Sequence, residues 1–312
     1  MVENKDNLYD MISANKKKSY LLTIVFVLVL IFMGFVLGIM LGIGWLGLIL
    51  AVIISIAMSF TSYYYSDKIA LMQARAELAD KEKYKKLYDV VEEMSIASGC
   101  PMPKVYIIND SSPNAFATGR DPQHSSIAVT TGLLEMMNRE ELEGVIAQEM
   151  SQVMNYDIRF SSIVVVLVGS IALIAGIMRF SAFFGGGSRR NSGEGEAGAF
   201  LIIIGLILAI LAPFFATLIQ LSISRKRESL ADSSGAFISR NPAALASALT
   251  KIGKYTGEIT SSNGNATKNP ILSTANSATA HMYFNNPLGN VSGWFSTHPP
   301  IKERIKALES LM

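Results

Sequence analysis

Residues 140–157, EELEGVIAQEMSQVMNYD, carry the pattern around which the rest of the chain is organised. Apolar side chains recur there at helical spacing and predict one amphipathic helix with a buried face. The members of that face are Leu142, Val145, Ile146, Met150, Val153 and Met154. Asn138 is placed to cap the start of the helix, and Glu141 follows three residues later, where a capping-box acid belongs.

Three polar residues lie in the middle of this helix. Gln148 and Gln152 are four residues apart and therefore face the same way, and Glu149 directly follows the first of them. Zinc proteases place two histidine ligands at this spacing, with a general-base glutamate after the first. Because both histidine positions carry glutamine here, these residues leave open an enzyme, an inactive relative of one, or another kind of protein.

The composition indicates a membrane protein. Of the 312 residues, 50% are hydrophobic and 17% are charged, which is too apolar for an ordinary soluble protein. The net charge of +2 gives no indication of nucleic-acid binding. The single cysteine, Cys100, excludes an internal disulfide and is predicted to be a buried thiol. Four apolar stretches predict about four transmembrane helices: Tyr20–Leu41, Trp45–Tyr63, Phe160–Met178 and Ala199–Ile223.

The distribution of basic residues predicts the orientation. Lysine and arginine are concentrated in the N-terminal tail and directly after the second and fourth apolar stretches. The connection between the third and fourth stretches has three arginines, diluted by glycine, serine and two glutamates. Because cytoplasmic segments carry the excess of positive charge, both termini and the long polar segments are predicted to be cytoplasmic. The protein is thus expected to be a multi-pass protein of the plasma membrane.

The polar segments predict a small sheet packed beside helices. Ser66–Met94 is predicted to be helical, as a continuation of the second apolar stretch. Short strands are expected at Lys104–Ile108, Asn114–Ala117 and Ile127–Thr130, with a polar loop at Gly119–Ser125. Further helices are expected at Thr131–Met137, Ser222–Ser239, Pro242–Tyr255 and Ile301–Leu311. Thr256–Ser292 has little periodicity and is predicted to be a mobile surface loop or lid.

Four short motifs follow one another along the chain in an order that resembles a known protein family. They are PNAFATGR at 113–120, VTTGLL at 129–134, RKRESLAD at 225–232 and STHPP at 296–300. With the apolar hairpin before them and the helix at 140–157, they resemble the HtpX family of membrane zinc metalloproteases, relatives of the CAAX prenyl protease. The resemblance covers nearly the whole chain.

The resemblance implies a fold class and a division of the chain. The fold is expected to be an α+β membrane protein: a mostly helical, zincin-like catalytic domain with a small β-sheet, plus about four transmembrane helices. Residues 1–65 would form the tail and first hairpin, and residues 160–223 the other two membrane helices with a glycine-rich tip. Residues 66–159 and 224–312 would form the two halves of the catalytic domain.

The resemblance also assigns the metal site. Gln148, Gln152 and Glu228 occupy the family's zinc-ligand positions, and Glu149 occupies the position of the general base. In the active family members the metal activates a water molecule, and the glutamate takes its proton. Asp232, one helical turn after Glu228, would orient a ligand.

Further positions follow from the same resemblance. His298, in the THP string, would lie in the active site and help to stabilise the oxyanion. Arg304 would support the site or bind a carboxylate. Asn114, Ala115 and Phe116 would lie on an edge strand that receives the extended substrate by strand addition.

The two glutamines alter what the site is expected to do. An amide oxygen is a hard, weak donor that suits calcium or magnesium better than zinc, so Glu228 is left as the only strong ligand. We therefore expect this chain to bind zinc poorly and to hydrolyse peptides very slowly. Two origins remain open: a natural pseudo-protease, or a modified version of an active parent. His124 and His281 belong to no motif and are predicted to be surface residues.

Three kinds of function compete. The first is a protease of membrane quality control, whose active form cleaves misfolded membrane proteins or unfolded polypeptides on the cytoplasmic side. The second is a non-catalytic protein that binds extended segments of membrane proteins and regulates or shields them. The third, a channel or transporter, is disfavoured because the apolar stretches contain almost no charge. Lipid is an expected partner, and nucleic acid is not.

Overall fold

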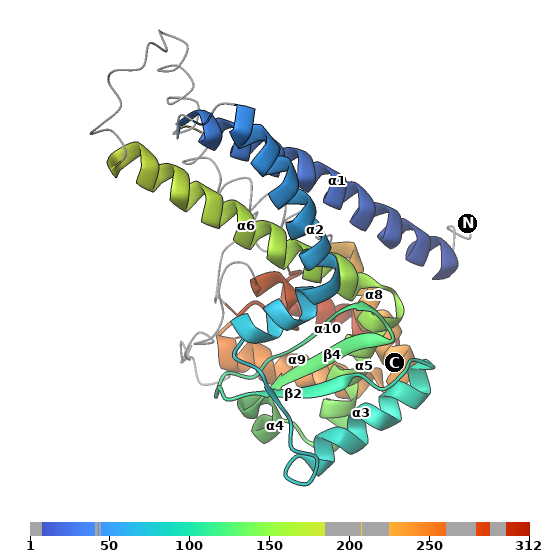
Figure 1. Ribbon diagram of the computed structural model, residues 1–312. Coiled ribbons are helices and arrows are strands. Elements are labelled where there is room, and N and C mark those ends of the chain that lie inside the picture. The colour runs from blue at the N-terminus through green and yellow to red at the C-terminus, as the bar shows by residue number, and fades with distance from the viewer. Residues whose placement is uncertain are drawn as a thin grey trace.

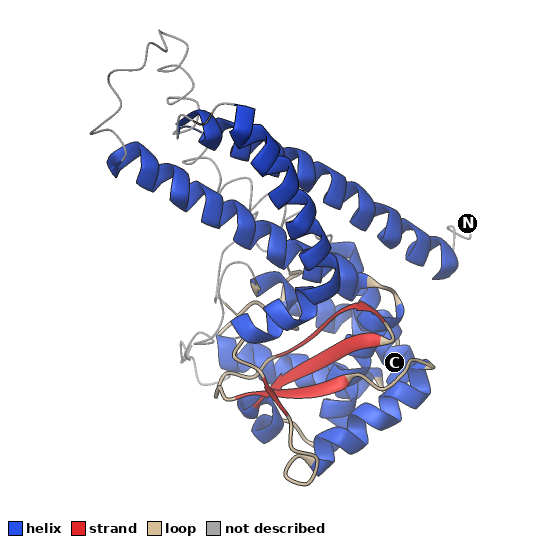
Figure 2. Cartoon of the chain, in the orientation of Figure 1, coloured by secondary structure: helices blue, strands red, loops and turns tan. Residues whose placement is uncertain are grey.

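The computed structural model describes residues 8–40, 43, 45–184, 207, 225–259, 279–287 and 298–312. Three long helices, α1 (Leu8–Met40), α2 (Trp45–Gln73) and α6 (Asp157–Phe184), extend from one side of a globular part (Figure 1). The globular part contains a sheet surrounded by shorter helices (Figure 2). Its elements are β1 (Glu77–Leu78), α3 (Lys85–Ser98), β2 (Lys104–Ile108), β3 (Ala115–Asp121), β4 (His124–Thr130), α4 (Thr131–Met136), α5 (Arg139–Met154), α8 (Arg225–Ser239), α9 (Pro242–Thr256), the 3-10 turn η2 (Ala280–Met282) and α10 (Ile301–Glu309).

The sheet has four strands in the order β1-β2-β4-β3. β2 and β4 are parallel, whereas β1 pairs antiparallel with β2, and β3 forms an antiparallel hairpin with β4. β3 is therefore an edge strand. A mostly helical domain with a small mixed sheet agrees with the α+β class expected from the sequence.

Both faces of the sheet are buried. Alternate strand residues, such as Val105 and Ile127, pack with α3, α5 and α9 in the main core. Residues of opposite parity, including Ile108 and Phe116, pack with the end of α2 in a second core. This second core also contains Val165 of α6 and the segment around η2. The ends of two long apolar helices are thus integral to the globular part.

The predicted strands are confirmed, but the predicted loop at Gly119–Ser125 is wrong. β3 continues to Asp121 and β4 begins at His124. The Asp121 carboxylate accepts a hydrogen bond from the backbone N–H of His124 at 2.8 Å. This side-chain contact closes a tight turn, so the polar residues extend the hairpin instead of separating the strands.

Two expected helices end earlier than predicted. Ser66–Met94 is not one helix, because α2 ends at Gln73 and β1 and α3 follow. Arg75 lies in the left-handed region, with φ of 52°, which stops the helix. The helix predicted to reach Asp157 likewise ends at Met154, followed by Tyr156 with φ of 60°. The chain turns there, and α6 runs in a different direction from α5.

Part of the predicted surface loop is buried. Within Thr256–Ser292 the structure describes the stretches before Thr260 and 279–287, and Tyr283 and Phe284 are only 1% and 0% exposed. His281 is also buried, so its prediction as a surface residue is wrong. Its Nε2 donates a hydrogen bond to the Ser161 carbonyl at 3.0 Å. Cys100 is half-buried, whereas His124 is exposed as predicted.

The membrane helices are supported in part. Two helical stretches, Trp45–Gln73 and Asp157–Ile177, are long and apolar enough to cross a bilayer, and Thr23–Ile39 is a shorter apolar stretch within α1. The fourth predicted span, Ala199–Ile223, lies outside the described residues except for Ile207. The glycine-rich tip is outside them as well.

Candidate active site

The start of α5 is held as the sequence predicts. The Asn138 side chain accepts a hydrogen bond from the backbone of Glu141 at 2.8 Å, and the Glu141 carboxylate accepts one from the backbone of Asn138 at 2.9 Å. Glu141 also pairs with Lys251 of α9 at 2.6 Å. This capping box and its ion pair fix the helix that carries Gln148, Glu149 and Gln152.

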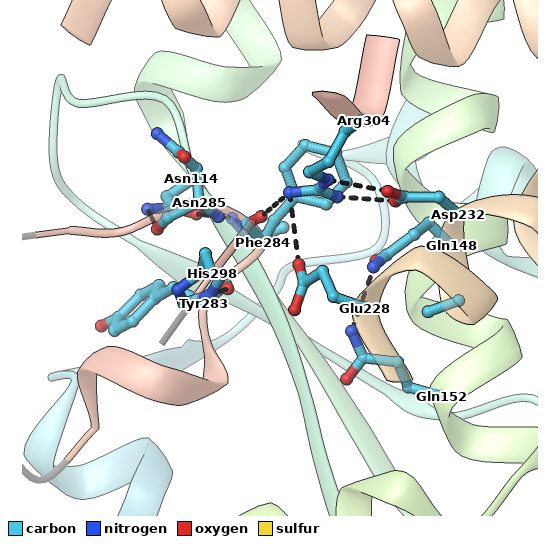
Figure 3. A network of polar contacts seen from close by, with 12 residues as sticks. Asn114, Gln148, Gln152, Glu228, Asp232, Tyr283, Phe284, Asn285, His298 and Arg304 are labelled. Carbon is cyan, nitrogen blue, oxygen red and sulfur yellow. Dashed lines mark hydrogen bonds and ion pairs between the residues drawn. The ribbon is translucent and has the colours of Figure 1, made fainter. Parts of the chain in front are cut away.

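A glycine brings α8 against this helix. A Cβ atom on Gly235 would lie 2.6 Å from the Cα of Gln148, so only glycine permits this approach. The Ser151 hydroxyl adds a hydrogen bond to the Ala231 carbonyl at 3.0 Å. Glu228 of α8 consequently lies beside the two glutamines, as Figure 3 shows.

The two glutamine side chains face each other. The Nε2 of Gln152 lies 3.5 Å from the Oε1 of Gln148, at the limit of a hydrogen bond. Gln148 is fully buried, and its own Nε2 has no hydrogen-bond partner among the described residues. The prediction that both side chains lie on one face of the helix is confirmed by this contact.

Arg304 is the centre of a buried polar network (Figure 3). Its Nε and Nη2 donate to the two carboxylate oxygens of Asp232 at 2.8 and 2.7 Å, a bidentate pair. Its Nη1 donates to the Phe284 carbonyl at 2.7 Å and lies 3.2 Å from the Glu228 carboxylate, an ion pair without hydrogen-bond geometry. Arg304 and Asp232 are 1% and 2% exposed, so both charges are removed from water.

Glu149 connects α5 to the edge strand. Its Oε2 accepts a hydrogen bond from the backbone N–H of Ala117 at 2.7 Å, and its Oε1 has no partner among the described residues. Burial, followed by the nearby Glu228 carboxylate, raises the pKa of Glu149 to about 8. Burial likewise raises the pKa of Glu228 to about 7, against the opposing charge of Arg304. One proton is thus readily held in this pair of carboxyl groups near neutral pH.

The residues expected to bind substrate contact another part of the same chain. The Ala115 carbonyl accepts a hydrogen bond from the Phe284 N–H at 2.7 Å. The Asn114 side chain bonds both backbone groups of Asn285, at 2.8 and 3.1 Å. The ring of Phe116 is buried and packs edge-on against Tyr283, with the centroids 5.0 Å apart. Residues 284 and 285 therefore occupy the start of the β3 edge.

His298 contacts the same segment. It is 4% exposed, and its Nε2 donates a hydrogen bond to the Tyr283 carbonyl at 2.7 Å. Burial lowers the pKa of His298 to about 4, so the imidazole is neutral at physiological pH. The sequence reasoning missed Tyr283, Phe284 and Asn285, because they lie in a stretch rich in small polar residues. The adjacent aromatic pair was the available signal.

The side chains present do not match the requirements of zinc. Gln148 and Gln152 offer only neutral amide groups, and Glu228 is paired with Arg304. Structural and catalytic zinc sites use thiolates, imidazoles and carboxylates. Within the described ranges, no group of three or more His, Cys, Asp or Glu side chains is arranged to hold a metal ion.

Comparison with known proteins identifies the class. Residues 81–312 match the profile of peptidase family M48. The chain is 46% identical to a "Protease HtpX homolog" of Caldanaerobacter subterraneus subsp. tengcongensis, over 98% of this chain and 99% of that protein. It is 45% identical to one of Thermoanaerobacter pseudethanolicus, over 99% of each. The chain therefore belongs to peptidase family M48, a family of zinc metalloproteases, and within it to the HtpX family. The resemblance predicted from the motifs is confirmed.

Proposed function

We propose that this chain is a membrane-embedded endopeptidase of protein quality control whose metal site has been lost. In this proposal the fold is that of an enzyme cleaving misfolded membrane proteins on the cytoplasmic side of the plasma membrane. Gln148, Gln152 and Glu228 occupy the ligand positions, and Glu149 and His298 the catalytic ones. Asp232 and Arg304 hold Glu228 in place.

The main observation in support of this proposal is the set of side chains around Glu228. An isolated carboxylate does not hold zinc in competition with water, and this one already has an arginine partner 3.2 Å away. Histidine nitrogen is the donor that the two α5 positions lack. This supports very weak zinc binding and very slow peptide hydrolysis in the chain as written.

The test replaces both glutamines with histidine. The purified full chain is expected to contain far less than one zinc per molecule by elemental analysis, and the Gln148→His/Gln152→His variant close to one. The same variant is expected to gain hydrolysis of an unfolded protein such as casein. Adding Glu149→Gln to it is the control, since zinc should remain while hydrolysis is lost. A full equivalent of zinc in the unaltered chain would refute the lost-site proposal.

A second candidate function, capture of extended polypeptide segments, is supported by the β3 edge. The Ala115 carbonyl already accepts a backbone hydrogen bond from another part of the chain, at Phe284, so this edge is suited to strand addition. A bound segment would have to replace residues 284 and 285. If the histidine variant folds but stays inactive, while the unaltered chain binds unfolded polypeptide, the capture function is favoured.

The membrane topology is proposed from the charge distribution. Exposed apolar side chains on the long helices, among them Leu28, Ile53 and Leu173, support contact with lipid. The basic segments beside Tyr20 and Tyr63 support a cytoplasmic position for the globular part. Protease accessibility in inside-out and right-side-out vesicles tests this orientation.

A further inference from the structure

Arg159 is a buried arginine at the start of α6. It is 6% exposed, and its guanidinium carbon lies 4.7 Å from the ring centroid of Tyr20 in α1 and 4.9 Å from that of Tyr63 in α2. α2 and α6 leave the globular part close to each other (Figure 1), and α1 packs against both. Two aromatic faces thus enclose one cation where three helices meet.

The nearby carboxylates are engaged elsewhere. Asp157, two residues before Arg159, pairs with Arg227 at 3.5 Å. Asp121 pairs with Arg120 and His124. No described Asp or Glu forms an ion pair with Arg159, and its buried Nε has no hydrogen-bond partner within the described ranges. Among the described residues, the charge of Arg159 therefore faces aromatic rings and no carboxylate.

The aromatic rings do not fully compensate for the burial of the Arg159 charge. A cation over aromatic rings gains less than removing an arginine from water costs. An anion at the remaining guanidinium N–H groups would complete the site. Arginine suits phosphate in particular, because its planar fork donates two parallel hydrogen bonds.

The position of the three residues indicates where that anion comes from. Tyr20 begins the first apolar stretch, Tyr63 ends the second, and Arg159 directly precedes the third. All three lie at the same end of the apolar stretches, where aromatic and basic residues meet the lipid headgroups. Lys68 adds positive charge, with its Nζ 5.1 Å from the ring centroid of Tyr65.

We propose that Arg159, Tyr20 and Tyr63 form a binding site for the headgroup phosphate of an anionic phospholipid. The inference rests on the membrane embedding proposed above. The tyrosine rings hold the guanidinium at the headgroup level, and the lipid phosphate supplies the missing negative charge. Tyr63 and Arg159 lie on α2 and α6, which also enter the second core, so bound lipid would steady the globular part against the membrane.

The test compares full-length variants in nanodiscs. Lipid retained after extraction is quantified for nanodiscs of phosphatidylcholine containing a small fraction of phosphatidylglycerol. The unaltered chain is expected to enrich phosphatidylglycerol, and Arg159→Gln to weaken that enrichment at least tenfold. Arg120→Gln is the matched control and should keep most of it, because Arg120 is partly exposed and pairs with Asp121.

Each other outcome has a defined meaning. Equal enrichment in Arg159→Gln, or equal loss in Arg120→Gln, overturns the site and leaves only general attraction to charge. Stabilisation of the detergent-solubilised chain by inorganic phosphate alone, lost in Arg159→Gln, overturns the assignment to lipid. If Arg159→Gln does not fold, the Tyr20→Leu/Tyr63→Leu variant replaces it in the test, and the same loss of phosphatidylglycerol enrichment is expected. Failure of the unaltered chain to enter nanodiscs refutes the proposed membrane embedding instead.

Discussion

Replacing Arg304 with methionine should destabilise the protein more than any surface change of the same kind. The substitution keeps an unbranched side chain but leaves Asp232 and Glu228 without their buried cation. Breaking a buried ion pair by removing one partner costs about 3–5 kcal/mol. Since 1 kcal/mol shifts the unfolding midpoint of a domain of this size by about 2–4 °C, the expected fall is roughly 6–20 °C.

The assay is thermal unfolding of the purified protein in detergent at pH 8, followed by circular dichroism. Arg139→Met is the matched control, because Arg139 pairs with Glu93 and Glu143 on the surface, where it is 48% exposed. Exposed pairs add little, so the midpoint of this control should barely change. Adding Asp232→Asn to Arg304→Met should recover part of the loss, since one unpaired charge is then gone. Equal midpoints for Arg304→Met and Arg139→Met would refute the reasoning.

Two further predictions concern the same site. The pKa of Glu149 is raised from 4.5 to about 8 in the folded chain, so its contribution to stability is complete below about pH 4.5 and is lost as the pH rises through about 8. Glu149→Gln should therefore make the unfolding midpoint fall less steeply between pH 5 and 8.5. One such group changes the free energy of unfolding by at most about 1.4 kcal/mol per pH unit. Parallel curves of midpoint against pH for the variant and the unaltered chain would contradict this. Gly235→Ala should cost about 1–3 kcal/mol, because its methyl group would meet the backbone of Gln148, whereas Gly169→Ala, with nothing within 4 Å, should cost no stability. An equal effect of both alanines in thermal unfolding would show that the approach of α8 to α5 is not tight.

The features predicted correctly are those that short-range spacing determines. The apolar periodicity of residues 140–157 and the pair of Asn138 and Glu141 predicted α5 and its capping box, because both depend on neighbours within one helical turn. The same spacing placed Gln148 and Gln152 on one face. The strands at Lys104–Ile108 and Ile127–Thr130 and the last helix also followed from local patterns.

The features that were missed depend on contacts between distant parts of the chain. Arg75 and Tyr156 adopt left-handed backbone conformations that are uncommon for their residue types. Each ends a helix that the sequence pattern predicts to continue. Tyr283 and Phe284 are buried because they pack on the edge strand, which lies more than 150 residues earlier in the sequence. Composition around them indicated a surface loop, and only tertiary packing overrides that indication.

α2 is one uninterrupted helix from Trp45 to Gln73, and its last turn is part of the core beside Phe116. The apolar helix α2 therefore continues into the core of the globular part without an intervening linker. The stretch matched by the family profile begins only at residue 81, after that turn. A fragment cut there would expose the part of the second core that Ala70, Leu71 and Ala74 cover, so we expect stable folding to require the end of α2. Any movement of α2 would therefore act directly on the sheet residues packed against its last turn, Phe116 of β3 among them.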